Sequence, residues 1–209
     1  MKNLVQQLIS PLIRTKLLSL ILGIIGFLAS LYSLLVHIEI QISPHQGRMC
    51  DMTNTINCSH VIGSSFGEIA TIPLGAFGLS YFIMVIIGAV FSLKEQASLK
   101  TTSYLQFFLA CLGFVVAVFL FYISYFKIRV ICPVCSLVHF ILFTYFILQV
   151  RQLIKARKKN KSENISHYLI QKFIIYSICF ALPPLAAGLF TPLLIDQIAL
   201  AEKQPNKSK

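Results

Sequence analysis

The chain of 209 residues is 56% hydrophobic and only 12% charged, with a mean hydropathy of +0.78, which excludes an ordinary soluble domain and indicates an integral membrane protein. Its formal net charge of +11 does not indicate nucleic acid as a partner. On a chain that crosses a membrane repeatedly, basic loops instead lie beside anionic lipid headgroups.

Five windows free of Asp, Glu, Lys and Arg predict transmembrane helices at residues 17–36, 72–93, 101–126, 130–150 and 173–195. Each has the roughly 20 residues needed to cross about 30 Å of hydrocarbon. We therefore expect an all-α integral membrane protein that forms one domain over residues 1–209. The first window is too long for the apolar core of a signal peptide and is expected to be retained. The tail, residues 196–209, is expected to be disordered.

Lys and Arg are distributed unevenly over the connections between these windows. Twelve of the eighteen lie in residues 1–16, 94–100 and 151–172, and the other six lie in the remaining connections. Basic loops tend to stay in the cytoplasm. The amino terminus is therefore predicted to be cytoplasmic, and the loop over residues 37–71 is predicted to lie on the outer face.

This outer loop is the longest connection, and it is rich in Ser, Thr, Asn, Gly and His. Such loops often carry function. Its segment 60–69 spaces four apolar side chains as on one face of a short helix that lies on the membrane. Pro73 follows the loop and is expected in the first turn of the second span.

Four of the six cysteines fall on the outer face in this orientation, namely Cys50, Cys58, Cys132 and Cys135. That is the oxidising side of a bacterial inner membrane or of an endoplasmic reticulum membrane. The other two, Cys111 and Cys179, lie within spans, where cysteine usually packs as a small apolar residue.

The motif C-P-V-C at residues 132–135 opens the fourth span. With Pro133 as the first helical residue, the two sulfurs lie on one face, close enough to form a disulfide after a small adjustment. The helix amino terminus is expected to lower the pKa of the Cys132 thiol and favour the thiolate. Cys135 is expected to point further into the bundle.

The second pair, Cys50 and Cys58, would close a nine-residue loop if bridged, worth about 2–3 kcal/mol. Together the two pairs predict a two-stage electron relay. Two alternatives remain open from the residues. The four cysteines form structural disulfides in a non-enzymatic membrane or transporter component, or they hold zinc with His45 or His60 near by.

The same residues resemble the vitamin K epoxide reductase family, in particular its bacterial branch. The strings C-D at 50–51 and I-N-C-S-H-V at 56–61 are similar to the family pattern C-D-x-x-x-x-I-x-C-S-x-V, and C-x-x-C follows at the start of the fourth span. Ser64, six residues after Cys58, stands where the family has a serine or threonine. The resemblance covers about residues 15–150. The order of the two pairs differs from that of the DsbB type of quinone-dependent oxidase.

The resemblance implies a four-helix transmembrane bundle around a quinone, ubiquinone or menaquinone, with the fifth helix added. It implies that Cys50, Cys58, Cys132 and Cys135 are catalytic in a quinone-dependent thiol oxidoreductase. Candidate quinone contacts are Ser64, Phe66 and His139. Asp51 and Ser64 are expected near the site, Asp51 either raising the pKa of the Cys50 thiol or solvating the loop.

The resemblance also implies a partner. Family members often carry a fused thioredoxin-like domain after the fifth helix, and this chain ends fourteen residues after Ile195. We therefore expect a separate periplasmic thioredoxin-fold (DsbA-like) oxidase, whose dithiol attacks Cys58. The freed Cys50 would then attack Cys132, and Cys135 would reduce the quinone.

The chain departs from the animal enzymes at two positions. It has no asparagine between Ile72 and Leu93, and His139 replaces a tyrosine four residues after the second cysteine of C-x-x-C. These departures argue against vitamin K epoxide as the substrate and leave a quinone acceptor in place.

Overall fold

The computed structural model describes residues 11–43, 50–53, 55–69, 72–94 and 99–158. In chain order the elements are α2 (Pro11–Ile42), α3 (Cys58–Ile62), β1 (Glu68–Ile69), β2 (Ile72–Pro73), α4 (Leu74–Lys94), α5 (Leu99–Tyr122), the π-helix η1 (Ile123–Ile128) and α6 (Pro133–Lys158). The fifth predicted span, Cys179 and the tail lie outside the described residues.

Within that part of the chain, four helices are long and apolar enough to cross a membrane: Ile13–Ile42, Leu74–Leu93, Ser103–Ile128 and Pro133–Ile154. They confirm the first four predicted spans and the helical membrane fold. The first helix extends beyond both ends of its predicted window, which ran from Leu17, directly after Lys16, to Val36. Lys16 is buried, and it is tolerated because it donates to the carbonyl of Ser92. Glu39 is tolerated because it is exposed.

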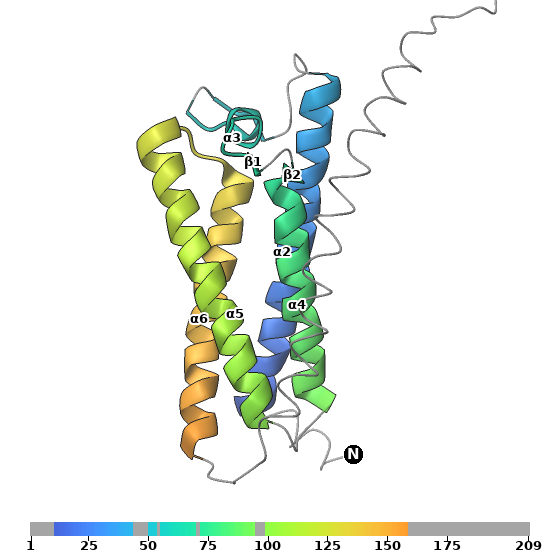
Figure 1. Ribbon diagram of the computed structural model, residues 1–209, viewed down its shortest axis with the longest axis vertical. Coiled ribbons are helices and arrows are strands. Elements are labelled where there is room, and N and C mark those ends of the chain that lie inside the picture. The colour runs from blue at the N-terminus through green and yellow to red at the C-terminus, as the bar shows by residue number, and fades with distance from the viewer. Residues whose placement is uncertain (1–10, 44–49, 54, 70–71, 95–98, 159–209) are drawn as a thin grey trace, which may run out of the picture.

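The four long helices run side by side along the long axis of the molecule, and α3, β1 and β2 lie together at one end (Figure 1). We call this the thiol end, because Cys50, Cys58 and Cys132 lie there. The helix α2 packs against α4 and α6, and α5 packs against α6. Their shared core is apolar and includes Phe82, Val85, Leu109, Ile141 and Tyr145.

Glycine brings α2 and α4 close together. A Cβ atom on Gly26 would lie 2.1 Å from the buried ring of Phe82, and one on Gly75 would lie 2.7 Å from the backbone nitrogen of Leu34. Lipid tails are as apolar as leucine, so helices in a membrane associate through such close contact rather than through the hydrophobic effect. The large apolar side chains exposed on α5 suit a surface that faces lipid.

Polar side chains connect the helices at the far end of the bundle, opposite the thiol end. Ser19 of α2 donates to the carbonyl of Thr15 and accepts from two α6 amides, Nε2 of Gln149 at 3.3 Å and Nε2 of Gln152 at 3.5 Å. In α6, Tyr145 donates to Gln106 of α5. Because unpaired polar groups are costly in lipid, these contacts hold three helices in register.

Candidate functional site

The loop that carries Cys50 is attached to α3 through Asp51. One carboxylate oxygen of Asp51 accepts from the backbone N–H groups of Cys58, at 2.9 Å, and Ser59, at 3.0 Å. The other accepts from the hydroxyl of Ser59 at 2.5 Å. The first turn of a helix has unpaired N–H groups, which a carboxylate satisfies well. Asp51 thus holds Cys50, its chain neighbour, beside Cys58. This positioning role differs from both roles expected from the sequence, which were raising the pKa of the Cys50 thiol and solvating the loop.

The predicted helix over residues 60–69 is wrong in position and length. The helix is α3, Cys58–Ile62, with Asn57 as its N-cap accepting from the N–H of His60 at 2.8 Å. At Gly67 a Cβ atom would lie 1.9 Å from the carbonyl oxygen of Ile62, so the chain folds back over α3 where only glycine fits. It then forms the short antiparallel pair β1–β2, and Pro73 ends β2 directly before α4.

Backbone hydrogen bonds join the loop to the start of the fourth span. Ile56 and Ile131 form a parallel bridge, in which Asn57 N–H donates to the carbonyl of Ile131 at 3.1 Å and Ile131 N–H donates to that of Thr55 at 2.9 Å. Ile131 is brought there by Arg129, whose φ of 58° ends η1 in the left-handed conformation. Cys132 therefore lies beneath the loop.

The four predicted catalytic cysteines form a continuous row of free thiols. Cys50, Cys58 and Cys132 pack together in one buried cluster, and Cys135 packs against it. Cys58 interacts with Cys50 and Cys132, and Cys132 interacts with Cys135. Cys50, Cys58 and Cys132 are 7%, 0% and 1% exposed. The spacing of the motifs predicted two pairs, and the structure adds that Cys58 is the loop cysteine in contact with Cys132.

Burial raises the pKa of the Cys58 thiol, and its bonds to the neighbouring thiols add to the rise. The pKa of Cys132 is also raised, first by its hydrogen bond with the Cys135 thiol and then by burial. The expectation of a lowered pKa is therefore wrong. The helix amino terminus does act as expected, since the N–H of Cys135 donates to Sγ of Cys132 at 3.2 Å. The interaction with the Cys135 thiol, together with burial beneath the loop, outweighs this effect on the pKa.

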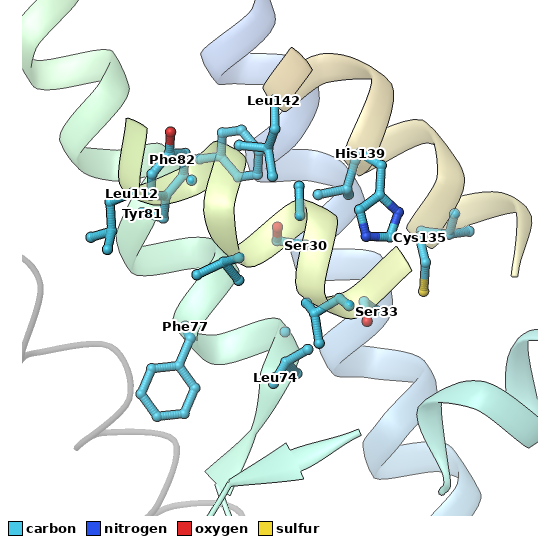
Figure 2. Close-up of a pocket in the computed structure, with 18 of the residues that line it drawn as sticks. Ser30, Ser33, Leu74, Phe77, Tyr81, Phe82, Leu112, Cys135, His139 and Leu142 are labelled. Atoms are coloured by element: carbon cyan, nitrogen blue, oxygen red, sulfur yellow. The ribbon is translucent and has the colours of Figure 1, made fainter. Parts of the chain in front are cut away.

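A cavity of about 330 Å³ begins at the last thiol of the row, Cys135, and extends between the four long helices (Figure 2). It is lined mainly by apolar groups: Ile69, Leu74, Gly75, Phe77, Gly78, Tyr81, Phe82, Leu112, Gly113, Val116, Ala117, Leu120, Val134, Val138 and Leu142. Ser30, Ser33 and His139 are its polar residues besides Cys135, and Tyr81 also carries a hydroxyl, which donates to the carbonyl of Leu109 at 3.2 Å. A size of about 300–1,000 Å³ and an apolar wall with few polar groups are typical of ligand sites.

Of the three predicted quinone contacts, only His139 lines this cavity. Ser64 instead donates its hydroxyl to the carbonyl of Val61 at 2.7 Å, and Phe66 is 45% exposed on the loop. The sequence analysis missed Ser30 and Ser33. In the sequence, the only sign of a shared role was their spacing of three residues, which places both on one face of α2.

The comparison with protein families agrees with this geometry. The model of the vitamin K epoxide reductase family matches residues 17–150, a range that holds both thiol pairs and every residue that lines the cavity. The chain belongs to the vitamin K epoxide reductase family. Membership implies a membrane thiol–disulfide oxidoreductase, and members of the family use quinones. The resemblance in the two cysteine motifs is thereby confirmed.

Proposed function

We propose that this protein reoxidises a separate periplasmic thioredoxin-fold disulfide oxidase and passes two electrons to ubiquinone or menaquinone in a bacterial inner membrane. The amino terminus is cytoplasmic and the thiol end faces the periplasm, as the distribution of Lys and Arg favours. The observation that supports the proposal best is the row of four thiols that ends in an apolar cavity between membrane-spanning helices.

The contacts within the row favour a definite order of exchange. A thiolate of the reduced partner attacks Cys50 of the Cys50–Cys58 disulfide and releases Cys58 as thiolate. The partner's second thiol then attacks the mixed disulfide, which leaves the partner oxidised and Cys50 reduced. This order exchanges the roles that the sequence analysis gave to Cys50 and Cys58, because the Cys58 thiol, in contact with Cys132, is the better placed for the next step.

In the second stage, the Cys58 thiolate attacks Cys132 of the Cys132–Cys135 disulfide and releases Cys135. Cys50 then attacks Cys58, re-forming the loop disulfide and leaving Cys132 and Cys135 as a dithiol. A quinone bound in the cavity supplies the electron acceptor for this dithiol. Two electrons and two protons leave the dithiol, its disulfide re-forms, and the quinone becomes hydroquinone. The transfer occurs at Cys135, the one cysteine of the row that lines the cavity.

The burial of Cys50 requires the loop to move before a partner can reach it. At 7% exposure its sulfur offers little surface to another protein. Residues 55–57 are attached to Ile131 by the two backbone hydrogen bonds described above, and the carboxylate of Asp51 is attached to α3. We infer that the partner binds the opened loop, and that closure then excludes water from the exchange between Cys58 and Cys132.

The test is quinone reduction by the purified full-length protein supplied with a reduced DsbA-type oxidase. Cys135→Ser should abolish turnover. Cys111→Ser, on α5 and outside the row, should retain it and serves as the matched control. No reduction of ubiquinone or menaquinone analogues, with both pairs stably bridged, would instead support the structural role of the cysteines.

The order of exchange has its own test. When the quinone-oxidised protein is mixed with limiting reductant, Cys50→Ser should accumulate a Cys58–Cys132 disulfide, because no thiol is left to resolve it. Mass spectrometry of non-reduced peptides identifies the bridge. The opposite result would be a Cys50–Cys132 bridge in Cys58→Ser and no Cys58–Cys132 bridge in Cys50→Ser. It would support the order expected from the sequence, in which Cys50 attacks Cys132.

A further inference from the structure

Two serines in the cavity have hydroxyl groups that the protein itself does not use. A serine within a helix commonly donates to the carbonyl of the preceding turn, as Ser19 does to Thr15 and Ser80 does to Ala76, both at 3.0 Å. Ser30 and Ser33 line the cavity, and neither has a hydrogen-bond partner among the described residues. Ser30 is only 3% exposed. Among the described residues, the buried polar atom that lacks a partner is Oε1 of Gln149 and not Oγ of Ser30. The Ser30 hydroxyl is therefore accessible from the cavity, where a ligand can supply the missing partner.

The packing of α4 keeps the Ser30 hydroxyl uncovered. Gly78 lies opposite, and a Cβ atom there would come within 2.5 Å of Oγ of Ser30. Any larger residue at position 78 would therefore displace this hydroxyl or cover it. Gly78 also lines the cavity itself, so the space beside the hydroxyl stays open to a ligand.

His139 also lines the cavity, on α6 one turn after Cys135. A neutral imidazole has one N–H and one acceptor nitrogen, so His139 adds to the polar side of the cavity without replacing the two serine hydroxyls.

We infer that Ser30 and Ser33 are the hydrogen-bond donors that hold a carbonyl oxygen of the quinone, an inference that rests on the proposed function. In Figure 2, Ser33, His139 and Cys135 lie together on the right, with Ser30 near the centre, and Phe77 and Leu112 lie on the opposite side. The ring occupies the polar side next to Cys135, and the apolar tail runs past Phe77 and Leu112.

This arrangement suits both redox states of the ligand. A serine hydroxyl rotates, so it donates to a quinone carbonyl and accepts from a hydroquinone hydroxyl. The two serines therefore donate the hydrogen bonds that bind the oxidised quinone. They replace the asparagine that the animal enzymes carry in the second span and that this chain lacks.

The experiment measures steady-state reduction of a short-chain ubiquinone analogue and of menadione by full-length protein, with dithiothreitol as electron donor. Ser30→Ala, Ser33→Ala and the double variant are compared with Ser80→Ala, whose lost hydroxyl is used within its own helix. The KM for quinone should rise roughly three- to tenfold in each single variant and further in the double variant, the range expected for one neutral hydrogen bond. In Ser33→Thr, which keeps the hydroxyl, the KM should stay near that of the wild type.

A second measurement separates quinone binding from thiol exchange. The rate at which dithiothreitol reduces the loop disulfide, followed by alkylation in the absence of quinone, should be unchanged in all of these variants. A KM in the double variant equal to that of Ser80→Ala would overturn the inference and leave the relay intact. Wild-type protein that reduces neither quinone would overturn the proposed function, and the inference with it.

Discussion

Replacing Asp51 by alanine should release Cys58 from its buried position. The change removes the three hydrogen bonds that the carboxylate accepts from the first turn of α3. A hydrogen bond to a charged group contributes about 1.5–3 kcal/mol, and a helix cap about 1 kcal/mol. Because Asp51 is half-buried and water would replace part of the loss, we expect the closed loop to lose about 2 kcal/mol in total. This corresponds to a roughly 30-fold larger open fraction.

The assay is the rate at which a small alkylating reagent modifies Cys58 in the reduced protein, determined by mass spectrometry of its peptides. Cys58 is 0% exposed, so modification requires opening. Asp51→Ala should raise the rate about 30-fold. Asp51→Asn keeps one oxygen to accept from the two N–H groups and should raise it far less. Glu68→Ala removes the same charge from β1 and should leave it unchanged. Equal rates in Asp51→Ala and wild type would refute the positioning role.

Three further changes should have measurable effects on stability. Gly26→Ala should lower the free energy of unfolding by about 1–3 kcal/mol, because its Cβ atom would overlap the buried ring of Phe82; thermal unfolding in detergent measures this. Lys16→Met should lower it by about 1–2 kcal/mol, because the last turn of α4 loses the cation that caps it. The reduced protein should lose stability as the pH rises above the usual thiol range near 8.5, since Cys58 and Cys132 hold their protons in the folded state and lose them on unfolding.

Each of these predictions has a specific control. Ala29→Gly, about one turn further along α2, introduces no new atoms and should lower the stability by no more than the about 1 kcal/mol that glycine costs inside a helix. Arg14→Met removes an exposed cation two residues before Lys16 and should change the melting temperature little. Protein with both disulfides formed has no thiols to titrate in the row, so its stability should not show the same fall above pH 8.5. A fall of equal size in that oxidised form would contradict the assignment to the thiols.

The parts of the fold that depend on local composition were predictable. Charge-free windows identified the first four spans, and Pro133 identified the start of the fourth, because a proline at the first helical position needs no N–H partner. The ends of the first span were not predictable from charge. Whether Lys16 breaks a span or caps a neighbouring helix depends on the carbonyl of Ser92, which is remote in sequence.

The candidate site divides in the same way. The four cysteines were identified from spacing and the resemblance, yet the order of their contacts depends on how the loop folds over α3. Ser64 and Phe66 were assigned to the quinone from their place along the chain, but the turn at Gly67 leaves them on the loop. Ser30 was missed because a serine in a span usually bonds to its own helix, and only its unused hydroxyl in the structure reveals it.

The polar contacts at the far end of the bundle have a consequence for biosynthesis. The helix α6 is the least hydrophobic of the four described spans, and its Gln149 and Gln152 are buried against Ser19. During synthesis α2 enters the membrane first, and it already presents Ser19 when α6 leaves the translocon. We expect α6 to partition into lipid together with this partner rather than alone. Ser19 thus provides a hydrogen-bond acceptor for a later segment of the same chain. The insertion of α6 then depends on α2 having been translated and inserted before it.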